Sequence, residues 1–244
     1  MTQDPSMQGD PPESGKPIGH WETRLMNSLG RELLLKYWDF PLFQSLLRTH
    51  GISLSDSTIL DVGCGSGYTT LLISERFSPR KLQAFDVMPE QVDRARARGL
   101  RAELFVADIT DPKLPAESFD AIFICGVLHH CPEWRKGLAQ TAGLLKDGGV
   151  LIIEEPGKNH IRLETVLMGR PPAEGAWLGL DELRDEMPRL GLATVEEKPL
   201  YFGLFSAFLC VKMAGERSPD YIFARQLLRI PQTGEIATGQ EVPA

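Results

Sequence analysis

The chain has 244 residues, a hydrophobic fraction of 42% and a charged fraction of 24%, which together indicate a globular protein with a substantial core. A formal net charge of -7 disfavours binding to nucleic acid, because contact with the phosphate backbone usually requires a basic face. No apolar run approaches the length of about 18 residues that a membrane-spanning helix needs, so the sequence predicts no transmembrane helix.

The cysteine pattern indicates a reducing compartment. The chain has four cysteines, no two of which form a Cys-x-x-Cys pair, and most lie in or beside apolar runs. The N-terminal segment is polar and proline-rich and lacks the apolar stretch of a secretory signal. We therefore expect a cytoplasmic protein without a disulfide framework.

The N-terminal fifth of the chain divides into a tail and a helical cap. Residues 1–19 are rich in proline, glycine and polar side chains, which predicts a flexible tail. Residues 20–50 carry apolar side chains at helical spacing. Because Pro41 interrupts this run, we expect two short cap helices.

Residues 51–213 are predicted to form the main α/β domain. From residue 58 onward, short apolar runs alternate with segments of helical periodicity. Such alternation indicates parallel strands joined by crossover helices. The expected strands are 58–62, 81–85, 102–107, 121–125 and 150–153, and the expected helices are 68–77, 89–98 and 134–145.

The pattern changes after the fifth strand. Residues 156–178 are irregular, and a helix is expected over 181–190 with Asp181 as its N-cap. Two strands, 195–202 and 204–213, are separated by Gly203 alone, which indicates antiparallel pairing at a sheet edge. Residues 214–244 form a mostly polar tail, in which 221–230 is expected to be an amphipathic helix packed on the domain; contact with a partner or a membrane is the alternative.

A glycine-rich loop is the strongest functional signal in the chain. Gly63, Gly65 and Gly67 follow an apolar strand at alternate positions, and a helix begins directly after them. Glycines allow a tight turn and close approach of a ligand, while the helix N-terminus favours an anionic group. The spacing is not the Gly-x-Gly-x-x-Gly of dinucleotide-binding proteins, and Asp61 precedes the loop inside the strand.

Two further carboxylates follow the next two strands. Asp86 lies about 20 residues beyond the loop, where a carboxylate can accept hydrogen bonds from both hydroxyls of a ribose. Asp108 ends the third strand and is a candidate acceptor for an adenine amino group, with Val87 and Ile109 as apolar walls. The alternatives are a helix N-cap for Asp86 and an ordinary loop carboxylate for Asp108.

These residues together resemble the class I S-adenosylmethionine-dependent methyltransferases, in particular the group around the quinone-biosynthesis enzymes. The resemblance covers residues 55–155 well and 178–213 by pattern only, and residues 119–130 and 144–149 look like the fourth-strand and fifth-strand motifs of that family. Asp147 stands where proline is more common in that family.

The resemblance implies a doubly wound, mostly parallel Rossmann-like sheet of seven strands whose last strand is antiparallel. It also implies that S-adenosylmethionine is the cofactor and S-adenosylhomocysteine the product. Cys64, Cys125 and Cys210 are interpreted as small apolar side chains that fill space, not as nucleophiles. The positions predicted to bind the cofactor are Asp61, Gly63, Cys64, Gly65, Gly67, Asp86, Val87, Asp108, Ile109 and Cys125.

Candidate catalytic residues follow the fourth and fifth strands. His129 and His130 lie at a strand C-terminus, where doubly wound sheets bind ligands, and histidine titrates near neutral pH. Either can act as the base that deprotonates an acceptor; helix capping or packing is the alternative. Glu154 and Glu155 are rival bases, of which strand alternation points only one to a given face, and Glu155 is chosen with the two histidines. Because adjacent residues rarely converge on one ion, no metal site is predicted.

The acceptor is predicted to be a small hydrophobic molecule methylated on oxygen, carbon or nitrogen. In enzymes of the family that the chain resembles, the acceptor pocket is built by the N-terminal helices and the insertion after the fifth strand. Here these are residues 20–50 and 156–178, of which the second is rich in apolar side chains. Two alternatives stay open: a methyltransferase acting on tRNA or protein, and a non-catalytic scaffold that binds the cofactor.

Overall fold

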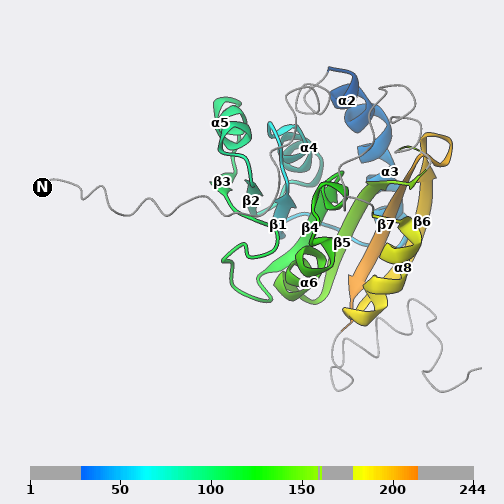
Figure 1. The fold of residues 1–244 in the computed structure, drawn as a ribbon. Coiled ribbons are helices and arrows are strands. Elements are labelled where there is room, and N and C mark those ends of the chain that lie inside the picture. Colours follow the sequence, from blue (N-terminus) through cyan, green and yellow to red (C-terminus); the bar gives the residue numbers. More distant parts are fainter. Residues whose placement is uncertain (1–28, 159, 161–177, 214–244) are drawn as a thin grey trace, which may run out of the picture.

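The computed structural model describes residues 29–158, residue 160 and residues 178–213 (Figure 1). The predicted tail 1–19, most of the insertion 156–178 and the C-terminal segment 214–244 with its expected helix lie outside the described residues.

A seven-stranded sheet forms the centre of the fold, with the strand order β3-β2-β1-β4-β5-β7-β6. β1 to β5 pair in parallel, while β7 is antiparallel to both of its neighbours, β5 and β6. The predicted doubly wound fold is therefore confirmed. The strands are β1 (Thr58–Val62), β2 (Lys81–Asp86), β3 (Glu103–Val106), β4 (Phe119–Cys125), β5 (Leu145–Pro156), β6 (Leu192–Leu200) and β7 (Phe205–Lys212).

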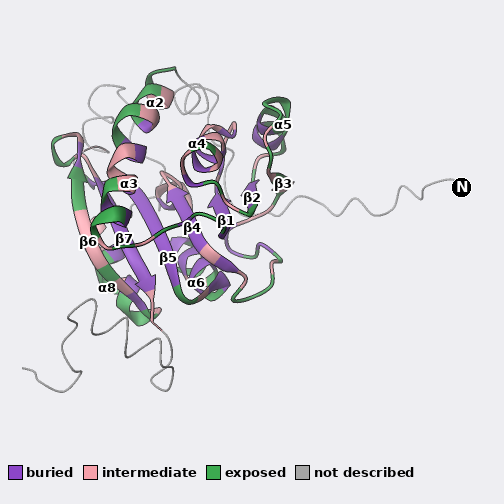
Figure 2. Ribbon diagram, turned by 180° about the vertical axis from the view of Figure 1, so that it is seen from behind, coloured by how far each residue is buried: buried purple, intermediate pink, exposed green. Residues whose placement is uncertain are grey.

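Helices cover both faces of the sheet, so the interior strands are apolar on both sides (Figures 1 and 2). One face packs against α6 (Trp134–Leu144) and α8 (Leu180–Arg189). The other packs against α3 (Phe40–Thr49) and α4 (Tyr68–Phe77), while α5 (Pro89–Ala97) contacts β2 and β3. Parallel strands joined in this way bring their C-terminal ends to one edge of the sheet, where the site described below is located.

The N-terminal helical region is continuous from Leu29 to Thr49, so the predicted break at Pro41 was wrong. α2 (Leu29–Leu34) leads into a wider π-helical turn, η2 (Leu35–Asp39), and then into α3. Pro41 lies in the first turn of α3, where its missing N–H is tolerated, and the widened turn before it relieves the crowding that a proline ring causes.

The C-terminal part differs from the prediction mainly at element boundaries. α8 begins at Leu180 after Gly179, whose N–H donates to the Glu182 carboxylate over 3.0 Å, so the predicted N-cap at Asp181 was wrong. A short 3₁₀ turn, Tyr201–Gly203, joins β6 to β7. The hairpin forms one end of the sheet as predicted, with β6 as the edge strand and β7 inserted next to β5.

Candidate active site

The glycine loop between β1 and α4 has the left-handed backbone that its sequence predicts. Gly63, Gly65 and Gly67 have φ angles of 67°, 53° and 85°. A Cβ at Gly63 would lie 2.5 Å from Val127, and one at Gly67 would lie 2.8 Å from the Ala95 Cβ. At Gly65, in contrast, a Cβ would have no heavy atom within 4 Å. The outer two glycines are therefore required by packing, and the middle one leaves open space in which a ligand can approach the main chain.

Asp86, at the end of β2, holds this loop in place. Its Oδ2 accepts a hydrogen bond from the Gly65 N–H over 2.9 Å, and its Oδ1 accepts one from the Met88 N–H over 2.9 Å. Burial raises the pKa of this carboxyl group, although the backbone donors oppose the shift. Each carboxylate oxygen can accept a second hydrogen bond, so the arrangement fits the ribose contact that the sequence predicts.

Asp61 and Cys64 support the loop from inside the protein. Asp61 is 1% exposed, and its Oδ2 accepts a hydrogen bond from the Thr70 hydroxyl over 2.6 Å, which ties β1 to α4. Burial raises the pKa of Asp61 to about 7. The N–H of the buried Cys64 donates to the Phe85 carbonyl oxygen over 2.9 Å. Both residues thus position the loop, and any direct contact with a cofactor stays a prediction.

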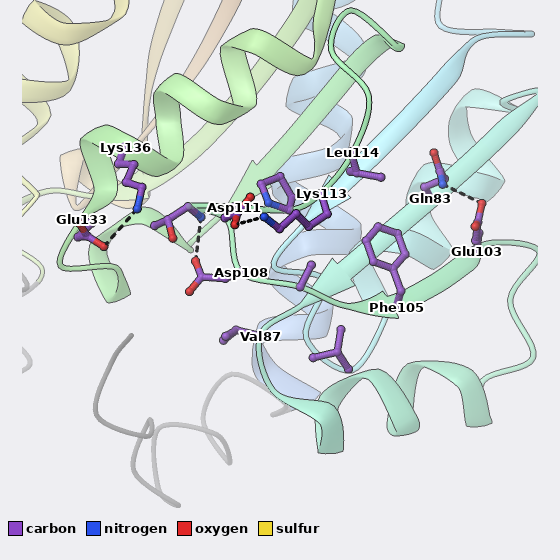
Figure 3. A pocket seen from close by; sticks show the side chains of 14 residues that line it. Gln83, Val87, Glu103, Phe105, Asp108, Asp111, Lys113, Leu114, Glu133 and Lys136 are labelled. Atoms are coloured by element: carbon purple, nitrogen blue, oxygen red, sulfur yellow. Dashed lines mark hydrogen bonds and ion pairs between the residues drawn. The ribbon is translucent and has the colours of Figure 1, made fainter. Parts of the chain in front are cut away.

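Of the three residues predicted to surround an adenine ring, Val87 and Asp108 lie together at the surface and Ile109 does not. Val87 is 44% exposed, and with Asp108 it lines a shallow depression of about 860 Å³ that continues along β3 (Figure 3). Asp108 Oδ1 accepts a hydrogen bond from the Thr110 N–H over 2.8 Å, which fixes the turn after β3. Ile109, predicted as the second wall, is buried in the core and packs against Gly137 of α6.

A pair of glycine variants separates strain from ligand contact. Gly51 and Gly65 both have positive φ angles, and a Cβ at either position would have no heavy atom within 4 Å. We expect Gly51→Ala and Gly65→Ala each to lower the free energy of unfolding by about 1 kcal/mol. Only Gly65→Ala should also weaken S-adenosylhomocysteine binding, as measured by calorimetry. Equal affinities in the two variants would contradict the placement of a ligand over Gly65.

The side chain of Glu155 organises the loop after β4. It is 0% exposed, and its Oε1 accepts hydrogen bonds from the N–H groups of Val127 and Leu128 over 2.9 and 2.7 Å. Its Oε2 lies 2.7 Å from Nδ1 of His129. Burial raises the pKa of Glu155 to about 7, against the opposing effect of the backbone donors and of His130. Glu155 therefore fixes both the position of this loop and the orientation of the His129 ring.

The structure brings the second histidine to the same place. The His130 and His129 rings have centroids 3.9 Å apart and are inclined by 42°, and both side chains are half-buried in the turn Leu128–His130. Glu155 contacts Nδ1 of His129, so in the ionised form it selects the tautomer in which Nε2 carries the lone pair. We refer to His129 and Glu155 as the His129 dyad. Its geometry suits a general base, and the catalytic role stays a prediction.

Glu154 points to the face of β5 opposite to that of Glu155, as strand alternation predicts, and it is shielded from solvent. It is 0% exposed, and its Oε2 accepts a hydrogen bond from Arg31 Nη2 of α2 over 2.6 Å. Arg31 Nη1 also donates to Asp39 Oδ2 over 3.1 Å, and the Tyr201 hydroxyl donates to the other Asp39 oxygen. Cys125, a predicted cofactor contact, is the register partner of Glu154 on β4.

We call Arg31, Asp39, Glu154 and Tyr201 the buried polar cluster. Burial lowers the pKa of Arg31, but the charges of Glu154 and Asp39 raise it above its usual value. Burial, reinforced by the Glu154 charge, raises the pKa of Asp39. Three of the four residues were not recognised in the sequence, because they lie far from the glycine loop in the chain. The sequence did contain one sign of this cluster. Two residues of opposite charge, Arg31 and Asp39, stand on either side of a helical segment that is rich in leucine.

Comparison with known proteins gives this site its context. Residues 59–149 match a protein family described as a methyltransferase domain. Residues 59–149 therefore form a class I methyltransferase domain. The matched segment contains the glycine loop, Asp86, Asp108 and both histidines, whereas Glu155 and the buried polar cluster lie outside it.

Curated relatives of the methyltransferase domain include enzymes that act on small molecules. The chain is 34% identical over 118 residues to trans-aconitate 2-methyltransferase of Methylobacterium radiotolerans, covering 48% of this chain and 45% of that enzyme. It is 29% identical over 100 residues to a chloroplastic 2-methyl-6-phytyl-1,4-hydroquinone methyltransferase of Oryza sativa, covering 40% of this chain and 29% of that enzyme. The chain spans about half the length, or less, of these relatives.

Solved structures confirm the fold of the methyltransferase domain. A SAM-dependent methyltransferase from Aquifex aeolicus superposes with a TM-score of 0.62 at 19% identity, covering 81% of this chain and all of that one. A structure described as a sarcosine dimethylglycine methyltransferase from Galdieria sulphuraria superposes with a TM-score of 0.61 at 18% identity, covering 75% of this chain and 87% of that one.

No helix among the described residues is long and apolar enough to cross a membrane.

Proposed function

We propose that this chain transfers the methyl group of S-adenosylmethionine to a small, largely apolar acceptor, and that the His129 dyad removes a proton from the acceptor. The observation that carries this proposal is the buried Glu155 carboxylate, which holds both His129 and the backbone of the loop at the C-terminal edge of the sheet.

The cofactor would be held by the loop over Gly65, with its ribose on the Asp86 carboxylate and its base beside Val87 and Asp108. The bound cofactor supplies an electrophilic methyl group on a positively charged sulfur. The open space at Gly65 and the shallow depression beside Val87 support this placement. Residues that orient the acceptor toward this methyl group would contribute much of the rate.

The role of His129 follows from its contact with Glu155. His129 Nε2 would accept the proton of an acceptor hydroxyl or amine. The electron pair left on that acceptor atom would form the bond to the methyl carbon, while the carbon–sulfur bond would break with its electron pair kept by the sulfur. The imidazolium that forms keeps its Nδ1–H directed to the Glu155 carboxylate, which stabilises the positive charge. Base catalysis of this kind contributes about 10²- to 10⁴-fold to the rate.

A small-molecule acceptor is supported by the relatives named above, and the acidic net charge of -7 argues against tRNA. The described cysteines are all free, which is what a reducing cytoplasm leaves, and we propose that compartment. A cofactor-binding scaffold without activity is the rival that the experiment must exclude.

The test is transfer of a radiolabelled methyl group from S-adenosylmethionine to a metabolite extract, followed by product analysis. We expect label in small apolar compounds. Calorimetric titration with S-adenosylhomocysteine runs in parallel, so that binding and transfer are measured separately. Label confined to protein or RNA would contradict the proposed acceptor class. Tight binding of S-adenosylhomocysteine without any transfer would instead establish the scaffold.

A further inference from the structure

One buried oxygen in the molecule has an unfilled hydrogen-bonding capacity. Glu154 is 0% exposed, and its Oε1 has no hydrogen-bond partner among the described residues. Its other oxygen, Oε2, accepts a hydrogen bond from Arg31 Nη2 over 2.6 Å. Buried polar atoms in folded proteins are nearly always hydrogen-bonded, so an unpaired carboxylate oxygen calls for a donor from outside the described chain.

The charges around this oxygen determine which donor fits. The buried polar cluster contains two carboxylates and one guanidinium. Both oxygens of Asp39 already have donors, namely Arg31 and the Tyr201 hydroxyl. Among the described residues of the cluster, Glu154 Oε1 is therefore the oxygen that has no donor, and these residues contain two carboxylates for one guanidinium. Such a position attracts a cationic or neutral hydrogen-bond donor and repels a second carboxylate.

The cluster and the His129 dyad border the same small surface, that of Gly126. An added Cβ at Gly126 would lie 3.9 Å from Arg31 Nη2 and 3.8 Å from His129 Cε1. The side chains of Arg31 and His129 are 21% and 19% exposed, so this surface is reached from solvent. The Arg31 guanidinium also lies over the Phe205 ring, with its carbon 5.9 Å from the ring centroid. A molecule bound against His129 would therefore lie beside the buried polar cluster, whose Arg31 also contacts the Phe205 ring.

We propose that Glu154 is a specificity-determining residue, whose Oε1 accepts a hydrogen bond from a hydroxyl or ammonium group of the acceptor. This inference rests on the proposed function and narrows its substrate class. The acceptor is an apolar compound with an alcohol, phenol or amine group, and a polycarboxylate such as aconitate is excluded by the excess acid.

The variant Glu154→Gln tests the polarity of this position. Arg31 only donates hydrogen bonds, so the glutamine carbonyl oxygen keeps the contact with Arg31. The amide NH₂ then occupies the place of Oε1 and presents donors where the parent protein presents an acceptor. The same substitution at Glu196, a β6 carboxylate that already contacts His50 and Lys198, is the matched control.

Three probes with one phenylethyl body distinguish the possible ligands: phenethylamine, 2-phenylethanol and 3-phenylpropionate. Their dissociation constants are measured by nuclear magnetic resonance titration of the protein saturated with S-adenosylhomocysteine. We expect the amine and the alcohol to bind about 10-fold more tightly than the carboxylate. Glu154→Gln should reverse the order of the amine and the carboxylate, and Glu196→Gln should preserve it.

The outcomes separate this inference from the proposed function. Tighter binding of the carboxylate, an order unchanged in Glu154→Gln, or no binding of any probe up to about 10 mM would each overturn the role of Glu154. A Glu154→Gln variant that loses affinity for S-adenosylhomocysteine would assign Glu154 to the cofactor and also overturn it. Failure of the proposed function appears differently, as a parent protein that binds no S-adenosylhomocysteine or transfers no methyl group.

Discussion

His129→Ala is expected to lower kcat by about 10²- to 10⁴-fold, with the affinity for S-adenosylhomocysteine within about twofold of the parent value. The substitution removes the base but leaves the Glu155 hydrogen bonds to the Val127 and Leu128 N–H groups in place. The loop should therefore keep its position. The measurement is methyl transfer to the acceptor identified by product analysis, together with calorimetry.

His50→Ala is the matched control for this variant. His50 Nε2 also lies 2.7 Å from a glutamate, Glu196, but this pair is at the β6 edge of the sheet. Its loss should leave kcat unchanged. Full activity of His129→Ala would reject the base assignment.

The pH dependence of the parent enzyme gives a separate prediction. Burial raises the pKa of Glu155 to about 7, and the dyad must be deprotonated before it can take a proton from the substrate. We therefore expect kcat/KM to rise with pH and to level off above about 7.

Asp86→Ala should weaken S-adenosylhomocysteine binding by about 100-fold or more. Two effects combine, because the variant loses the predicted charge-assisted bonds to the ribose and also the anchors of the Gly65 and Met88 N–H groups. Hydrogen bonds to charged groups contribute about 1.5–3 kcal/mol each, so losing two accounts for this magnitude. Isothermal titration calorimetry measures the change directly.

Asp93→Ala provides the comparison for Asp86→Ala. Asp93 lies on the exposed face of α5, and its Oδ1 accepts a hydrogen bond from Arg96 Nη1 over 3.0 Å. This variant should bind the cofactor product as the parent does. If Asp86→Ala and Asp93→Ala bind equally well, the carboxylate at the end of β2 does not grip the ligand, and the placement of the ribose must be abandoned.

The sequence was sufficient to predict the elements that follow one another closely along the chain. The glycine loop, the carboxylate after β2 and the strand–helix alternation depend on local spacing, and the structure has them where they were expected. The π-helical turn before Pro41 was not predicted, because proline usually ends or kinks a helical run. The predicted N-cap of α8, Asp181, lies two residues after the observed one, Gly179. Gly179 has no side chain that marks it as a cap in the sequence, and its N–H is instead bound by the side chain of Glu182.

The long-range contacts of the site were beyond what spacing indicates. Strand alternation separated Glu154 from Glu155, but it did not show that both are fully buried. Arg31 and Glu154 are 123 positions apart, and Asp39 and Tyr201 are 162 apart. Only the completed sheet brings these groups together, so their pairing requires the tertiary structure.

The insertion of β7 next to β5 has a consequence for synthesis of the chain on the ribosome. β7 is the last of the described strands to be translated, yet it pairs with β5 from Val150 to Pro156 and carries the edge strand β6 with it. Until residue Lys212 has emerged, the apolar β5 is an open edge prone to pairing with other chains. Tyr201, in the turn between β6 and β7, is also translated long after Asp39, so the buried polar cluster is completed late in synthesis.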